Sequence, residues 1–176
     1  NVSMLAMAVL HWHPSSVLYL FLITFSYVIG SFYSGLILGS SSFRLDRLYG
    51  IPLSLVTIFI LLCWIFLPYF PRYALLWACV AMGVQNAMIS HYKGTIIRTT
   101  HLSGVLTDLG LALGYRARGL DVDRKRVILH LLILCGFFLG GLIASLIYPL
   151  LKLDSFIVPA SFSFVLSMVY WIIYLR

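Results

Sequence analysis

Seven polar or ionisable side chains lie within eleven consecutive residues of an otherwise apolar chain, and they are the first candidates for chemistry. They are Arg98, Thr99, Thr100, His101, Ser103, Thr107 and Asp108. Arginine and histidine can hold an anion, hydroxyl groups exchange hydrogen bonds with a polar solute, and a carboxylate can carry a proton. The cluster belongs to the segment 91–119, HYKGTIIRTTHLSGVLTDLGLALGYRARG, in which an apolar run follows the polar residues. This order predicts a polar loop that leads into a short helix.

The remainder of the chain has the composition of a membrane protein. Of its 176 residues, 62% are hydrophobic and 10% are charged, and the mean hydropathy is +1.04. Several nearly uncharged segments approach or exceed the ~20 residues that a helix needs to cross a bilayer. They predict five spanning helices, at residues 17–43, 51–71, 73–90, 127–151 and 155–175. Because these runs lack the alternation of barrel strands, we expect an all-α membrane protein with one polytopic domain over residues 1–176.

The net charge of +7 follows this expected topology. If the helices alternate in direction, ten basic residues share one side of the membrane, and only Arg72 and Lys152 lie on the other. The ten are Arg44, Arg47, Lys93, Arg98, Arg116, Arg118, Arg124, Lys125, Arg126 and Arg176. Because basic loops stay in the cytoplasm, we expect a multi-pass membrane protein with a cytoplasmic carboxy terminus. Topology explains the charge, so no nucleic-acid partner is expected.

Two further helices are expected to be too short to span. Residues 1–12 would form a helix about 18 Å long, and His11 and His13 at its end predict an interfacial pair rather than a metal site, which needs three or four converging ligands. The second short helix lies in the segment 91–119, which must enter the membrane and return if both of its ends are cytoplasmic. We expect Ser103 to cap a helix that starts at Gly104, with its N–H groups available to an anion or polar group.

Several polar residues have both a functional and a structural interpretation. Asp108 is either a proton or cation carrier in a transport path, or an ion-pair partner of Arg98 or Arg116. Gln85 and Asn86, near the end of the third expected span, either hydrogen-bond to neighbouring helices or line a substrate path. The sequence leaves both pairs of alternatives open.

The order of elements repeats within the chain, in pseudo-repeats at about residues 1–70 and 73–176. Each contains a short helix, a polar break, a span with small residues at four-residue spacing, and a span that opens with a proline, Pro52 or Pro159. The matching small residues are Ser31, Gly35 and Gly39 in one half and Gly136, Gly140 and Ala144 in the other. The charge distribution gives the halves opposite orientations, as in the inverted repeats of secondary transporters. A three-plus-three arrangement then requires one more helix before Asn1.

The residues QNA at 85–87 and RTTHLSGVLTDLG at 98–110 resemble the signature of the YoaK family of bacterial inner-membrane proteins, a family of unknown function. The resemblance is strong over residues 85–110 and weaker elsewhere. It implies a membrane location and a two-half layout, and it supplies no substrate. It also implies a preceding helix that ends in a TGN-like motif, of which Asn1 would be the last residue.

Motifs of the common enzyme classes are missing from the sequence. It contains no HExxH, CxxC or GxSxG pattern and no paired carboxylates, and its five acidic residues are all aspartates. Cys63, Cys79 and Cys135 fall inside expected spans and are predicted to be inert core residues. We therefore expect a protein that is not an enzyme and that has neither a cofactor nor a metal ion.

These observations favour a transporter or permease of a small polar or anionic solute, with a central site at the repeat interface. The expected partners are membrane lipid, that solute, and a second copy or another membrane protein. The alternative is a non-catalytic structural or accessory subunit of a larger membrane complex. The predicted substrate-binding residues are Asn1, Gln85, Asn86, Arg98, Thr99, Thr100, His101, Ser103, Thr107 and Asp108.

Overall fold

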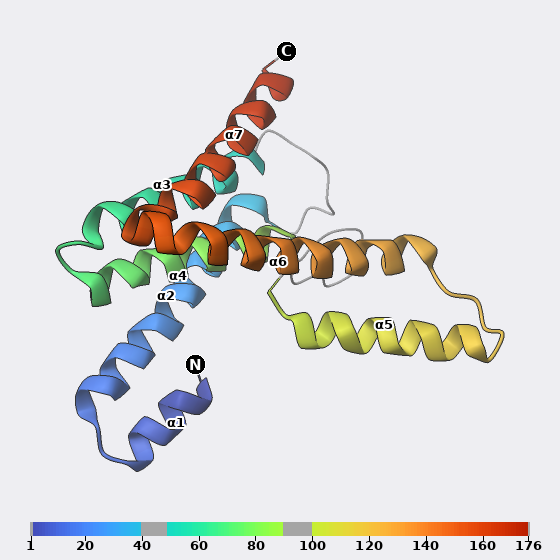
Figure 1. Ribbon diagram of the computed structural model, residues 1–176, viewed down its shortest axis with the longest axis horizontal. Coiled ribbons are helices and arrows are strands. Elements are labelled where there is room, and N and C mark those ends of the chain that lie inside the picture. The colour runs from blue at the N-terminus through green and yellow to red at the C-terminus, as the bar shows by residue number, and fades with distance from the viewer. Residues whose placement is uncertain (1, 40–48, 90–99, 176) are drawn as a thin grey trace. The chain divides into compact units, whose positions relative to one another are not determined.

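The computed structural model describes residues 2–39, 49–89 and 100–175, and these residues are helical with no strand among them. The elements in chain order are α1 (Val2–Leu10), α2 (Pro14–Leu38), α3 (Gly50–Phe66), α4 (Pro71–Ile89), α5 (Leu102–Ala117), α6 (Arg124–Leu151), a 3-10 segment (Lys152–Phe156) and α7 (Ile157–Tyr174) (Figure 1). The all-α prediction is thus confirmed. By their contacts the helices form two compact units, residues 1–96 with 153–176, and residues 97–152.

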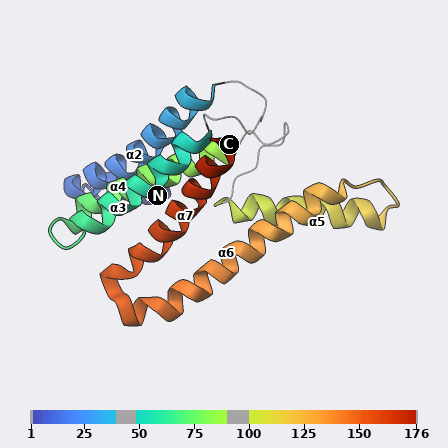
Figure 2. The same cartoon turned by 90° about the horizontal axis from the view of Figure 1, so that it is seen from above.

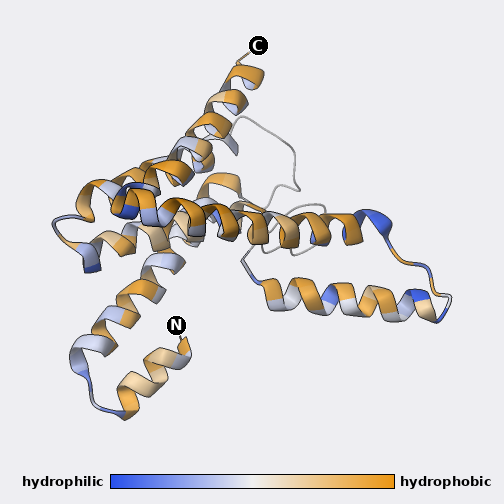
Figure 3. Ribbon diagram, viewed as in Figure 1, coloured by the Kyte–Doolittle hydropathy of each residue, from blue (hydrophilic) through white to orange (hydrophobic). Residues whose placement is uncertain are grey.

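Two helical stretches in the described ranges are long and apolar enough to cross a membrane. One is α2, with 25 residues and a mean hydropathy of 1.7, and the other runs over residues 124–174, with a mean hydropathy of 2.6. Figure 3 shows α6 coloured as hydrophobic along most of its length and hydrophilic at its first turn. The apolar helix α3 has 17 residues, about 26 Å at 1.5 Å per residue. The prediction of five spanning helices is therefore supported for two stretches only.

In the first unit, α4 lies between α2 and α3, and α7 packs on α3 (Figure 2). The contact between α2 and α4 is close because glycine occurs on both helices at the crossing. A Cβ atom at Gly30 would lie 2.1 Å from the carbonyl oxygen of Val80, and one at Gly83 would lie 2.1 Å from that of Tyr27. The Ser31 hydroxyl donates to the Gly83 carbonyl at 3.2 Å across the same crossing. Small residues thus let the two backbones approach, as in other membrane helix pairs.

The sequence predicted a small-residue face on α2 at Ser31, Gly35 and Gly39, and the structure places only Ser31 of these three at the α4 crossing. A Cβ atom at Gly35 or Gly39 would meet nothing within 4 Å. The packing face is carried instead by Gly30 and, one turn later, Ser34, which is fully buried. Among the described residues, the Ser34 hydroxyl is a buried polar group without a hydrogen-bond partner.

Hydroxyl and indole groups join α3 to α7. The Thr57 hydroxyl donates to the Ser163 hydroxyl at 2.9 Å, and Ser54 and Ser167 share a hydrogen bond at 2.8 Å. The Trp171 indole N–H also donates to Ser54, at 3.1 Å. Ser163 and Ser167 are buried and are one turn apart on α7, so their hydroxyl groups form an interhelical contact.

The second unit is a hairpin of α5 and α6. Gly119 ends α5 in the left-handed region, with φ of +76°, and its N–H donates to the carbonyl of Arg116 at 3.0 Å. Such a glycine is a common helix terminator, because other residues meet a steric penalty there. Asp123 then begins α6, and its carboxylate accepts the N–H groups of Lys125 and Arg126 at 2.9 and 3.4 Å. The helix-ending glycine and the helix-starting aspartate fix the turn between the two helices.

Two predictions about this hairpin were wrong. Helix α5 begins at Leu102 rather than Gly104, and the residue at its cap position is His101, whose side chain makes no capping hydrogen bond. Ser103 therefore lies inside the first turn and does not cap the helix. Cys135, expected in the core, is exposed on α6, whereas Cys63 is buried and Cys79 half-buried. All three are free thiols.

The boundaries of the two units do not coincide with the predicted pseudo-repeats. Within each unit, a short helix is followed by a longer one that it contacts, α1 by α2 and α5 by α6. This matches the expected order of elements. The opposite orientation of the halves stays a prediction.

Candidate functional site

Within the described residues, the α5–α6 hairpin contains an aspartate that contacts both an arginine and a buried histidine. The guanidinium of Arg126 lies 3.0 Å from Oδ2 of Asp108, and Nε2 of His130 lies 3.5 Å from the same oxygen. The His130 side chain is only 5% exposed, compared with 35% for Asp108 and 51% for Arg126. The contacts therefore run from the hairpin surface at Arg126 to a buried imidazole at His130.

Helix geometry explains why these three side chains meet. Arg126 and His130 are four residues apart on α6, so they lie on one face of that helix. Asp108 stands on the packing side of α5, one turn after the buried Val105. Asp123 fixes the first turn of α6 through its capping hydrogen bonds and so fixes the position of Arg126.

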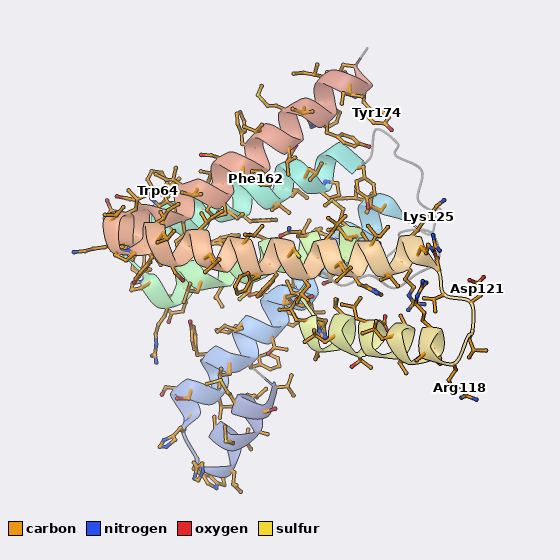
Figure 4. The ribbon with its side chains drawn as sticks, turned by 45° about the vertical axis from the view of Figure 1, so that its right-hand side comes forward. Trp64, Arg118, Asp121, Lys125, Phe162 and Tyr174 are labelled. Atoms are coloured by element: carbon orange, nitrogen blue, oxygen red, sulfur yellow. The ribbon has the colours of Figure 1, made fainter. Side chains whose placement is uncertain are left out.

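A cavity of about 260 Å³ adjoins this ion pair. Its charged and titratable lining side chains are Asp108, Asp121, Asp123, Tyr115, Arg126 and His130. Figure 4 labels Asp121 in the turn between the helices, next to Lys125 at the start of α6. Because both partners contact Oδ2 of Asp108, its Oδ1 is left for a solute, a water molecule or a proton. The cavity can therefore exchange hydrogen bonds with a small polar molecule.

The structure places several predicted site residues in this unit, but only Asp108 lines the cavity. The Thr107 hydroxyl donates to the Ser103 carbonyl of its own helix at 2.8 Å, so its proton is used within α5. His101 and Ser103 are exposed in the first turn of α5, and Thr100 is half-buried just before it. His101 lies seven residues before Asp108, about two turns of helix.

Gln85 and Asn86 belong to the other unit, on α4. Asn86 is 3% exposed, and its side-chain amide donates to the carbonyl of Met82 at 2.9 Å. Gln85 is half-buried. The hydrogen bond of Asn86 satisfies its donor within α4, which favours a structural role for that group. The remaining predicted site residues, Asn1, Arg98 and Thr99, lie outside the described residues.

Sequence reasoning missed the partners of Asp108. It named Arg98 or Arg116 as the ion-pair partner, whereas the structure pairs Asp108 with Arg126. The second partner is His130, which is buried next to this carboxylate. The signal was the four-residue spacing of an arginine and a histidine at the start of an apolar helix. The turn at Gly119 brings Arg126 and His130 opposite Asp108.

The comparisons with known proteins give a family and no activity. A model of the protein family described as Protein of unknown function (DUF1275) matches residues 1–169. The chain belongs to this family. No curated protein and no solved structure shows significant similarity to the chain. The family match covers the α5–α6 hairpin, all of α2 and residues 124–169 of the second membrane-length stretch.

The hairpin chemistry is that of a carboxylate that contacts both a guanidinium and an imidazole. Arg126 presents a fixed charge and a fork of donors, which suits a carboxylate, phosphate or sulfate group. The arrangement can therefore exchange one anion for another on Arg126 while His130 stays in contact with Asp108.

Proposed function

We propose that this DUF1275 protein is a transporter or permease of a small polar or anionic solute in a bacterial inner membrane. The resemblance to YoaK proteins supports the membrane location, as do the two membrane-length stretches, whose most apolar windows are only 17% and 6% buried. A core helix of a soluble protein would be mostly buried. Apolar helices with exposed surfaces need a lipid environment.

The observation that carries the transport proposal is the Asp108–Arg126–His130 cluster beside a cavity of about 260 Å³. Ionisable side chains are costly within membrane helices, and they mark solute paths and proton relays. His130 stands in the second turn of the apolar helix α6 and is 4% exposed. A purely interfacial ion pair does not require a buried imidazole as its third member.

In the proposed mechanism, an anionic solute competes with Asp108 for Arg126. When the solute takes the guanidinium, the carboxylate of Asp108 keeps the buried imidazole of His130 as its partner. The solute would then leave when Asp108 pairs with Arg126 again. The remaining substrate-binding residues stay predictions from the sequence; they are Arg98, Thr99, Thr100, His101, Ser103, Gln85 and Asn1.

Flux measurements in proteoliposomes test this function. The purified protein is reconstituted in vesicles, and uptake of labelled sulfate, phosphate and small carboxylates is followed together with the internal pH. We expect at least one anion to enter faster than in protein-free vesicles, and we expect Asp108→Asn and Arg126→Gln to reduce that rate by more than about tenfold. Arg118→Gln is the matched control, because Arg118 lines neither cavity of the hairpin. Equal rates for all the variants would refute the site.

A second function, that of a structural subunit in a membrane complex, is favoured by one observation on α6. A Cβ atom at Gly136, Gly140 or Gly141 would meet no atom of its own unit within 4 Å. Small residues without a packed neighbour can receive a helix from another chain. Co-purification with a second membrane protein at fixed stoichiometry, with no anion flux in vesicles, would favour this function over transport.

A further inference from the structure

The two sides of the α5–α6 hairpin differ in charge. The cavity beside Asp108 has three carboxylates, from Asp108, Asp121 and Asp123, and one arginine in its lining. The second cavity of the hairpin, about 600 Å³ in volume, has Arg116 and Arg124 in its lining and no carboxylate. We call this second cavity the arginine groove. Neither of its arginines forms an ion pair with another residue of the described chain.

The arginine groove is charged at one end and apolar at the other. Arg116 is in the last turn of α5 and Arg124 is the first residue of α6, so both lie at the loop end of the hairpin. Leu109 lies seven residues before Arg116, and Leu131 lies seven residues after Arg124. Each leucine is therefore about 10 Å from its arginine along the helix, at 1.5 Å per residue. The remaining lining residues are Ala112, Leu113, Val122, Val127 and Ile128.

This polarity matches one class of ligand. A molecule that fits must carry negative charge at one end and hydrocarbon at the other, because unpaired guanidinium groups favour phosphate and exposed leucines favour an alkyl chain. Leu113 is 71% exposed and Ile128 is 57% exposed, so apolar surface in the groove is uncovered. A soluble phosphate would leave that surface in water, and a zwitterionic lipid carries no net negative charge to neutralise the two arginines.

We propose that the arginine groove binds an anionic phospholipid, with the phosphate at Arg116 and Arg124 and one acyl chain along Leu113 and Ile128. The proposal rests on the membrane location in the proposed function and is independent of transport. Under the topology predicted from the basic loops, this end of the hairpin is cytoplasmic, where anionic lipids concentrate and each basic residue adds to their binding. The lipid would cover apolar surface that the hairpin alone leaves exposed.

Native mass spectrometry of the delipidated full chain in detergent tests the proposal, with phosphatidylglycerol and phosphatidylcholine as probes. We expect wild-type protein to retain phosphatidylglycerol preferentially. The double variant Arg116→Gln/Arg124→Gln should lose about tenfold or more of that affinity, given the contribution of each basic residue to anionic-lipid binding. Leu113→Asn/Ile128→Asn, which keeps both charges, should also weaken retention, because the acyl chain loses its apolar contact.

The matched control is Arg118→Gln/Lys125→Gln. It removes the same two charges from the same end of the hairpin (Figure 4) but from positions outside the groove lining. We expect this control to change retention by less than about twofold. An equal loss in both double variants would show diffuse electrostatic attraction, and no preference for phosphatidylglycerol would exclude a headgroup site. Either result overturns the proposal, provided that circular dichroism shows each variant to be as helical as the wild type.

The lipid site and transport can fail separately. Anion flux measured in vesicles of phosphatidylcholine alone tests transport without the proposed ligand. Selective lipid retention without flux would leave the groove assigned and reject the transporter. Anion flux without lipid selectivity would support the transporter and reject the lipid site in the groove.

Discussion

Asp108 is the residue at which the polar chemistry of the hairpin converges. A single carboxylate oxygen receives both the guanidinium of Arg126 and the imidazole of His130. The two partners differ in exposure, so their contributions to stability must differ as well. An ion pair that is half exposed contributes little, because water screens it. A buried side chain contributes through its packing as well as its charge.

Substitutions in this cluster should separate these contributions. Asp108→Asn or Arg126→Gln should lower the free energy of unfolding by about 1 kcal/mol or less, because the pair is exposed. His130→Ala should cost about 2 kcal/mol or more, because it empties a buried site. Thermal unfolding in detergent, monitored by circular dichroism, shows which substitution destabilises the protein most. A cost for Arg126→Gln above that for His130→Ala would contradict the assignment of His130 as the buried member.

Tyr49, just before α3, gives the first unit a dependence on alkaline pH. Its hydroxyl donates to the carbonyl of Met88, and burial raises the pKa of Tyr49 from 10.0 to about 12. Below pH 10 the phenol is protonated in both the folded and the unfolded chain. Between pH 10 and 12 the unfolded tyrosine ionises first, so stability falls as pH rises.

The difference in stability between wild type and Tyr49→Phe isolates this effect. This difference should be constant below pH 10. As pH rises to 12, the wild type should lose up to about 2 kcal/mol of its free energy of unfolding relative to the variant. Urea unfolding at a series of pH values measures it. A difference that stays constant through this range would mean that Tyr49 is not buried against Met88.

At the scale of elements, the α2–α4 crossing depends on the missing side chains of Gly30 and Gly83. Each position faces a backbone carbonyl of the other helix, which cannot rotate away as a flexible side chain would. The α3–α7 contact uses a different chemistry, with hydrogen bonds between hydroxyl groups. Close backbone approach and polar pairs are the two ways in which helices associate where lipid removes the hydrophobic driving force.

Gly30→Ala and Gly83→Ala should therefore each destabilise the protein by about 2 kcal/mol, because the new methyl group forces the helices apart. Gly35→Ala on the same helix is the control, since its Cβ would meet nothing within 4 Å. We expect the control to be neutral or stabilising by about 0.5 kcal/mol through helix propensity. Thermal unfolding of the three variants checks the contrast. Similar melting temperatures for all three would rule out a close crossing at Gly30.

At the scale of the whole molecule, the basic residues predict which loops face the cytoplasm. The turn with Arg118 and the carboxy terminus are expected inside, and the α3–α4 turn with Arg72 is expected outside. The hairpin loop also carries the charged end of the arginine groove. Topology therefore decides which leaflet could supply its lipid.

Single cysteines in a chain without Cys63, Cys79 and Cys135 test this topology. A membrane-impermeant maleimide added to intact spheroplasts should label Arg72→Cys and should leave Arg118→Cys unlabelled until the membrane is opened. The reason is that the reagent reaches only the outer face. Labelling of Arg118→Cys in intact spheroplasts would reverse the orientation, and labelling of neither after opening would mean that the sites are buried.

Composition and the period of the apolar residues were enough to predict an all-helical protein, because long uncharged runs have few other solutions for their backbone hydrogen bonds. They also located α2, α3, α4, α6 and α7 to within a few residues, whereas Asp108 as a site residue stays a prediction. Helix starts were less certain, as Leu102 shows, because several polar residues near a helix start can each act as a cap. Register was harder still: Gly30 and Gly35 are equally small, and only the partner helix distinguishes them.

What only the tertiary structure decided is which distant residues meet. Among the described residues, Arg116 and Arg126 are both arginines within reach of Asp108 along the sequence, and the left-handed Gly119 together with the Asp123 cap selects Arg126. The same turn sends Arg116 and Arg124 to the opposite cavity, without carboxylates. Charge type and hydropathy are local properties and can be read from the chain. The pairing of charges depends on the direction in which each helix leaves a turn, which is a property of the folded backbone.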